Sequence, residues 1–175
     1  MNRTGTKIWN LIEKLVRTIL EFFFHLFKIE LSDKQWDSLF QFVKFGIVGV
    51  WNTIFSYTIN IVCLLIFQRT GILDMYDLDM YVANLISFAI SVLVSFLLNS
   101  KFVFTLNEGE SRNFGRALLK SYLSYGFTGI FLNNVLAYIW VSILGISKFI
   151  APVFSLFIAI PINFLMNKLW AFRTE

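Results

Sequence analysis

The sequence predicts an all-α polytopic membrane protein: four transmembrane helices form two tandem hairpins of parallel repeats, preceded by an amphipathic interfacial helix. Three observations predict this class. Of the 175 residues, 57% are hydrophobic and only 15% are charged, which is unlike a soluble domain. Apolar runs long enough to cross a bilayer occur four times, and the later two repeat the earlier two. We therefore divide the chain into an N-terminal helix, 1–35, and a transmembrane domain, 36–175.

Residues 6–30 predict a helix that lies in the membrane interface instead of crossing the membrane. Polar side chains recur at helical spacing and leave the apolar residues on the other face: Lys7, Asn10, Lys14, Arg17, Glu21, His25 and Lys28. The apolar run is too interrupted for a signal peptide, and no small-residue cleavage site follows it. We place His25, the only histidine, on the solvated face beside Glu21.

A short polar break at 31–38 precedes the first of four predicted spans. The spans are expected at residues 41–67, 80–104, 117–143 and 149–172. The first loop contains Asp74, Asp77 and Asp79, which we interpret as solvated because the glycine and glutamate of a calcium loop are missing. Trp51 lies too deep for an interfacial position, so we expect it inside the bundle or against substrate.

The spans repeat one another in pairs. On the second span, polar residues spaced by three or four form one stripe: Asn84, Ser87, Ser91, Ser95 and Asn99. An offset of 68 places the last four of these over Ser155, Ala159, Asn163 and Asn167. The first and third spans repeat at an offset of 80, which aligns Gly46 and Gly49 with Gly126 and Gly129. Small residues at such spacing let another helix approach closely, and both copies run in the same direction.

The distribution of charge predicts the orientation. With the N-terminus inside, 13 of the 15 Lys and Arg residues are cytoplasmic, and only Arg69 and Lys148 lie outside. We therefore expect both termini in the cytoplasm. The net charge is +4, and the basic residues flank apolar runs. We therefore expect anionic membrane lipids as partners, and we do not expect nucleic acid. Cys63 lies within an apolar run and is expected to form neither a disulfide nor a metal site.

The motifs exclude several classes of function. The sequence has no motif for ATP hydrolysis, for a catalytic nucleophile or for a zinc protease, and no Asp or Glu lies well inside a span. We expect neither an enzyme nor a cofactor, and a carboxylate proton relay is disfavoured. The spans instead offer amides and hydroxyls, with cations at one end. This combination suits a lipid-linked sugar phosphate, whose phosphate needs cations and whose sugar needs hydrogen-bond partners in hydrocarbon.

The predicted substrate-binding residues are these amides, hydroxyls and flanking cations: Lys44, Asn52, Asn84, Ser91, Ser95, Asn99, Lys101, Arg116, Lys120, Asn133, Asn163, Asn167 and Lys168. The lysines at the inner helix ends are expected to collect the phosphate, and the polar stripes to provide a route for the sugar hydroxyls. The alternative is that the serines and asparagines only bond neighbouring helices, while the lysines only reach toward the interface.

Three strings resemble a known family. They are F-x-K-F-x-x-V-G-x-x-N from Phe42, S-F-L-L-N-x-K-F-V-F from Ser95, and N-F-L-M-N-K-L-W-A-F from Asn163. Over residues 40–173 the chain is similar to the GtrA-like family of small four-span bacterial membrane proteins. That resemblance implies the bacterial cytoplasmic (inner) membrane and the flipping of polyprenyl-phosphate-linked sugars for a membrane glycosyltransferase. Family members often carry a lysine where this chain has Pro152, and Lys148 lies four residues earlier.

The leading hypothesis is translocation of an undecaprenyl-phosphate-linked monosaccharide, driven by its consumption on the far side, for cell-surface polysaccharide or teichoic-acid glycosylation. The alternative is a non-transporting scaffold subunit of a polyprenyl-phosphate-dependent glycosyltransferase. A third hypothesis is a binder of anionic lipid that works through its N-terminal helix. Four helices hardly enclose a sugar, so we expect a homo-oligomer or a partner glycosyltransferase that completes the groove.

Overall fold

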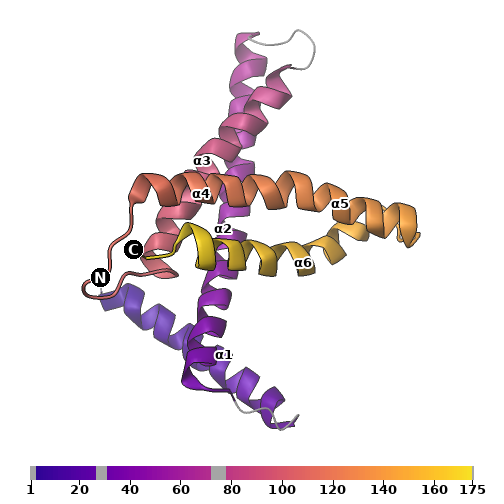
Figure 1. The fold of residues 1–175 in the computed structure, drawn as a ribbon. Helices are drawn as coiled ribbons and strands as arrows, with labels where there is room; N and C mark the ends of the chain where they lie inside the picture. The colour runs from indigo at the N-terminus through magenta and orange to yellow at the C-terminus, as the bar shows by residue number, and fades with distance from the viewer. Residues whose placement is uncertain (1–2, 27–30, 72–77, 175) are drawn as a thin grey trace. The chain divides into compact units, whose positions relative to one another are not determined.

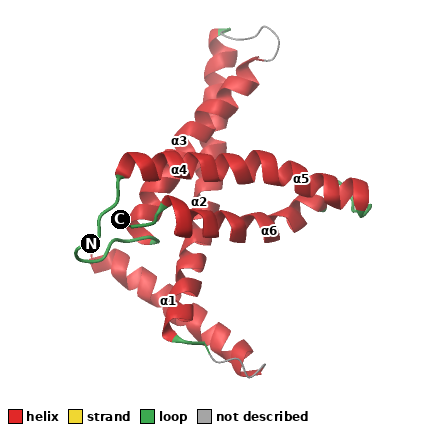
Figure 2. Cartoon of the chain, in the orientation of Figure 1, coloured by secondary structure: helices red, strands yellow, loops and turns green. Residues whose placement is uncertain are grey.

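The regular elements of the described residues are all helical (Figure 1). This computed structural model describes residues 3–26, 31–71 and 78–174, and in the first helix only the side chains of 9–22. Every regular element in these ranges is helical and none is a strand (Figure 2), so the predicted all-α class is confirmed. The side chain of His25 and the residues Asp74 and Asp77 lie outside the described part of the chain.

The chain forms two units, residues 1–41 and residues 42–175. The first unit holds α1, Arg3–Leu26, and the first turns of α2, Asp33–Thr70. The second unit holds the rest of α2 and every later helix. The boundary between the units therefore falls inside a continuous helix.

The polar break predicted at 31–38 is wrong, because most of it is the first turns of α2. The backbone N–H and the hydroxyl of Ser32 both donate to Oε1 of Gln35, at 2.8 and 3.0 Å. The carbonyl of Ser32 accepts from the N–H groups of Gln35 and Trp36. Serine followed three residues later by glutamine is the capping-box signature, and it starts the helix here.

In the second unit, α3 spans Leu78–Phe102 and is followed by a long helical segment. That segment comprises α4 (Phe114–Gly126), the π-helical η2 (Phe127–Leu132), α5 (Asn133–Tyr138) and the π-helical η3 (Ile139–Ile143). The chain returns through α6 (Ala151–Met166) and the π-helical η4 (Asn167–Ala171). The returning segment runs antiparallel to α4 and α5, and it contacts both (Figure 1).

Within the described residues, four helical segments are long and apolar enough to cross a membrane: Asp33–Thr70, Leu78–Phe102, Phe114–Ile143 and Ala151–Ala171. Each overlaps one of the four predicted spans. The prediction of a polytopic membrane protein is thereby confirmed.

The repeat at an offset of 68 is visible in which side chains are buried. On α3 every fourth residue is buried: Ala83, Ser87, Ser91, Ser95 and Asn99. On α6 and η4 the buried residues at the corresponding positions are Ala151, Ser155, Ala159 and Asn167. All these side chains are at most 8% exposed. Small side chains at this spacing let helices approach closely, which is how helices associate in lipid.

A group of phenylalanine rings, which we call the aromatic core, connects α2, α3 and the segment of α6 and η4: Phe45, Phe96, Phe104, Phe164 and Phe172. The ring of Phe164 lies 5.5 Å from that of Phe45 and 5.9 Å from that of Phe104, measured between centroids. The ring of Phe172 lies 5.3 Å from that of Phe96. Because these residues come from α2, α3 and α6 with its extension, the core connects both hairpins.

The two repeats end in the same backbone turn. The carbonyl of Asn99 accepts from the N–H of Phe104 at 2.8 Å, and the carbonyl of Asn167 accepts from that of Phe172, also at 2.8 Å. In each repeat the donor lies five residues beyond the acceptor, so the turn is wider than an α-helical one. These turns place Phe104 against Phe172, with ring centroids 4.6 Å apart and planes at 29°.

The glycines of the first and third spans do not make the close helix contacts of this chain. A Cβ atom added at Gly46, Gly49, Gly126 or Gly129 would meet no neighbouring helix within 4 Å. The contacts are made by the alanine and serine stripes instead. Trp51 is 56% exposed, so the expectation that it packs inside the bundle is wrong for the single chain.

The aromatic core predicts a difference between two phenylalanines. Phe104→Ala removes the ring stacked on Phe172, and we expect it to lower the free energy of unfolding by about 3 kcal/mol. Phe157→Ala is the matched control, because that ring is 75% exposed, and we expect a change below about 1 kcal/mol. Unfolding of both variants in the same detergent measures the difference. Equal destabilisation would show that the stacked pair does not hold the helix ends together.

Candidate functional site

A group of buried polar residues lies next to the aromatic core, and we call it the amide cluster. Its members come from α3, α4 and η4: Ser95, Asn99, Ser121, Ser124, Tyr125 and Asn167. Five of them are at most 1% exposed, and Tyr125 is half-buried. Three helical elements thus each contribute neutral polar groups that are buried or half-buried.

Tyr125 connects α4 to α3 through its hydroxyl. The Tyr125 oxygen lies 2.9 Å from Oγ of Ser95 and accepts from Nδ2 of Asn99 at 3.2 Å. Nδ2 of Asn99 also donates to Oγ of Ser95 at 3.2 Å. On the other repeat, Nδ2 of Asn167 donates to the carbonyl of Asn163 at 2.8 Å and to its Oδ1 at 3.0 Å. The two asparagines of the repeat are therefore held by different partners.

Part of the amide cluster is unsatisfied. Within the described residues, Oδ1 of Asn99, Oδ1 of Asn167 and the hydroxyls of Ser121 and Ser124 are buried without a hydrogen-bond partner. Leaving such an atom unpaired costs about 1–3 kcal/mol. Native proteins retain such atoms where an ordered water, a ligand or another conformation satisfies them.

The predicted cations surround the same end of the helices, which we call the basic end. Nζ of Lys120 donates to the carbonyl of Trp170 at 3.3 Å. Nζ of Lys168 lies 5.6 Å from the ring centroid of Phe164, and Nζ of Lys101 lies 5.4 Å from that of Phe102. Two further predicted cations are half-buried Lys44, inside α2, and exposed Arg116, in the first turn of α4.

Arg112 contacts the ends of both repeats, and the sequence did not single it out as a site residue. Its Nη2 donates to the carbonyl of Phe104 at 2.9 Å, and its guanidinium lies 4.9 Å from the ring centroid of Phe172. Partial burial lowers the pKa of Arg112 from its ordinary value, and the Glu110 carboxylate opposes that shift. Arg112 thereby caps the carbonyl end of α3 with a positive charge.

Three predicted site residues lie apart from the amide cluster. Oδ1 of Asn84 accepts from Nδ2 of Asn60 at 2.8 Å, so this pair joins the two helices of the first hairpin. Asn52 is half-buried, and its Oδ1 has no partner among the described residues. Ser91 donates to the carbonyl of Phe88 at 3.1 Å, within its own helix.

The remaining predicted residue, Asn133, lies in a cavity of about 660 Å³ that we call the hairpin pocket. The pocket lies between the α5 and η3 segment and α6. Its polar lining comprises Asn133, Asn134, Ser142, Lys148 and Ser155. Its apolar lining comprises Ala137, Tyr138, Val141, Ala151, Pro152 and Leu156. One cation, amide and hydroxyl groups and an apolar wall thus meet in one cavity.

Tyr125 was not among the predicted residues, although the sequence contained a signal for it. Ser121, Ser124, Tyr125 and Thr128 recur at spacings of three, one and three, which puts them on one face of a helix. The same search for a polar stripe that selected Asn99 on the second span selects this face on the third.

This fold, with four helical segments long and apolar enough to cross a membrane in the described residues, defines the class as a multi-pass membrane protein. A family model described as GtrA/DPMS, transmembrane domain, matches residues 44–172. The chain therefore belongs to this family, which supports a membrane function related to polyprenyl-phosphate sugars, and the resemblance seen in the sequence is confirmed. Neither a search of curated proteins nor a search of solved structures found a match.

The bridge between α3 and α4 predicts the effect of removing one oxygen atom. Tyr125→Phe removes the hydroxyl that contacts both Ser95 and Asn99, and we expect it to lower the free energy of unfolding by about 1–2 kcal/mol. Tyr57→Phe is the control, because Tyr57 is 68% exposed, and it should have almost no effect. Thermal unfolding in one detergent compares the two. If Tyr125→Phe is as stable as the control, the bridge does not join the helices.

Proposed function

We propose that this chain translocates a polyprenyl-phosphate-linked monosaccharide across the bacterial cytoplasmic membrane, for glycosylation of a cell-surface polysaccharide or teichoic acid. The observation that carries the proposal is the hairpin pocket, because it offers amides, hydroxyls and an ammonium group beside an apolar wall. Its volume of about 660 Å³ is in the range of small-molecule sites. Membership of the GtrA/DPMS family supports the same class of substrate.

Each part of such a lipid has a matching group in the pocket. The ammonium group of Lys148 is exposed and suits a phosphate. The amide groups of Asn133 and Asn134 donate to the carbonyls of Gly129 and Ile130 one turn earlier, at 3.5 and 2.6 Å. These bonds orient the amides and direct their oxygens to sugar hydroxyls. The apolar side of the lining suits the first units of a polyprenyl chain.

The basic end is proposed to receive the lipid on the other side of the membrane. Lys101 and Arg116 are exposed there, and Lys44, Lys120 and Lys168 are half-buried. In the predicted topology this end faces the cytoplasm, where lysines and arginines also attract anionic lipids. In this proposal, cations that can bind the phosphate are present both in the hairpin pocket and at the basic end.

We place the route of the sugar along the contact between α3 and α4. Ser87, Ser91 and Ser95 are at most 5% exposed, so the stripe is closed in this structure. Passage requires α3 and α4 to separate, and the hydroxyl of Tyr125 is the group that bridges them near Asn99. Moving a hydroxyl out of water without a partner costs roughly 2–7 kcal/mol, so a stripe of hydroxyls lowers the barrier. Consumption of the product on the far side supplies the direction.

The scaffold hypothesis is the second candidate, and the open glycine faces favour it. Gly46 and Gly49 on α2, with Gly126 and Gly129 on the third span, have room for a neighbouring helix. A glycosyltransferase or a second copy of the chain is the proposed occupant of these faces. In this function the chain would recruit the enzyme and move no lipid.

Translocation can be measured directly in liposomes that contain a fluorescent polyprenyl-phosphate monosaccharide. We expect the wild-type chain to speed exposure of the sugar to an external reagent. We expect Lys148→Gln to slow it about tenfold, because a hydrogen bond to a charged group is worth about 1.5–3 kcal/mol. Arg69→Gln is the matched control, since Arg69 is the other cation predicted outside and does not line the pocket.

Two results would contradict the proposal, and they are distinguishable. If the wild-type chain produces no acceleration, translocation is wrong and the scaffold function is favoured. If the wild-type chain is active and Lys148→Gln matches Arg69→Gln, the chain translocates lipid but the hairpin pocket is not the site of the headgroup.

A further inference from the structure

α1 separates its side chains into two faces between residues 9 and 22. At about 100° per residue, the apolar residues occupy one half of the helix: Trp9, Leu11, Ile12, Leu15, Val16, Ile19, Leu20 and Phe22. The polar residues occupy the other half: Asn10, Glu13, Lys14, Arg17, Thr18 and Glu21. A helix with this separation has one face for water and one for an apolar environment.

Part of the apolar face is uncovered, and we call it the apolar strip. Leu11 is 68% exposed, Leu15 is 61% exposed and Ile19 is 48% exposed, and they follow one another at intervals of four residues. They line a shallow hollow of about 320 Å³, whose polar edge is formed by Lys14 and Thr18. Three large side chains in a row are a substantial apolar surface to leave in water.

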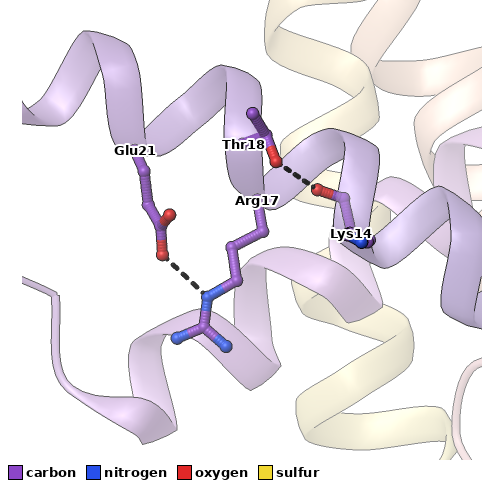
Figure 3. A network of polar contacts seen from close by, with 4 residues as sticks. All are labelled: Lys14, Arg17, Thr18 and Glu21. Carbon is purple, nitrogen blue, oxygen red and sulfur yellow. Dashed lines mark hydrogen bonds and ion pairs between the residues drawn. The ribbon is translucent and has the colours of Figure 1, made fainter.

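The polar face is satisfied by contacts within the helix and with the start of α2. Nε of Arg17 donates to Oε1 of Glu21 at 2.8 Å, and the Thr18 hydroxyl donates to the Lys14 carbonyl at 2.9 Å (Figure 3). The guanidinium of Arg17 also lies 5.4 Å from the ring centroid of Trp36, in the first turn of α2. Arg17 therefore joins α1 to the helix that leads into the membrane.

We infer that α1 lies in the headgroup layer of the bilayer that the rest of the chain spans, with the apolar strip turned toward the acyl chains. The occupant of the strip is lipid, because α2 continues without interruption from Asp33 into a transmembrane span. Tryptophan prefers the membrane–water interface, and Trp36 is the ring that Arg17 contacts. Lys14 lies at the edge of the strip, where its long side chain reaches the lipid phosphates.

This position gives the chain a membrane-surface element outside the family domain, whose match begins at residue 44. An amphipathic helix of this kind binds through its apolar area and through attraction of its cations to anionic lipids. The inference does not depend on translocation, since it concerns residues far from the hairpin pocket in the sequence.

The inference is tested on the full chain in vesicles of phosphatidylcholine and phosphatidylglycerol. In a Cys63→Ser background, an environment-sensitive fluorophore is attached to a single cysteine, with Leu15→Cys and Ile19→Cys on the strip and Asn10→Cys on the polar face. We expect doxyl-labelled lipid to quench positions 15 and 19 at least about twofold more than position 10. Iodide in the water should quench position 10 more than the other two.

Two outcomes would overturn the inference. Equal iodide quenching at positions 10, 15 and 19 would show that the strip faces water. Protection of positions 15 and 19 from both iodide and doxyl lipid would show that protein covers the strip, either a second copy or another part of the chain.

Discussion

The stacked pair of Phe104 and Phe172 is the contact on which the rest of the transmembrane unit depends. Each ring is positioned by a wide turn that closes on the carbonyl of an asparagine, Asn99 in one repeat and Asn167 in the other. Because the two repeats end in the same way, their last residues meet and the neighbouring rings fill the space around them. The asparagine side chains are thereby held beside α4, where the amide cluster forms.

Lipid provides no hydrophobic driving force for helices to associate. Close packing of small residues and hydrogen bonds between helices must therefore hold them together. The alanine and serine stripes on α3 and α6 provide the close approach, and the Tyr125 hydroxyl provides a bond between α3 and α4. The unpaired oxygens of Asn99 and Asn167 show that packing does not use every polar group. The accessible polar groups lie elsewhere, in the hairpin pocket, which is why the proposed headgroup site is placed there.

The sequence predicted the four spans and the repeat at an offset of 68, because periodicity and composition are local properties. It selected Asn99 and Asn167 correctly as equivalent positions, since both end a helix in the same turn. It missed Arg112, because only the folded loop brings that guanidinium to Phe104 and Phe172. The hairpin pocket was likewise not predicted, since Asn133 and Lys148 line one cavity only after the chain folds back between α5 and α6. The start of α2 at Asp33 was not predicted, although Ser32 and Gln35 carry the sequence signature of a capping box.

Whether the two repeat ends meet can be measured most directly by oxidative cross-linking in native membranes. The chain with Cys63→Ser would carry Phe104→Cys and Phe172→Cys, and a second version would carry Phe104→Cys and Phe157→Cys, whose second position is 75% exposed on α6. We expect the first pair to form a disulfide within one chain, seen as a reducible change in electrophoretic mobility, and the second pair not to form one. Failure of the first pair to cross-link, or equal cross-linking of both, would contradict a fold held together by its paired helix ends.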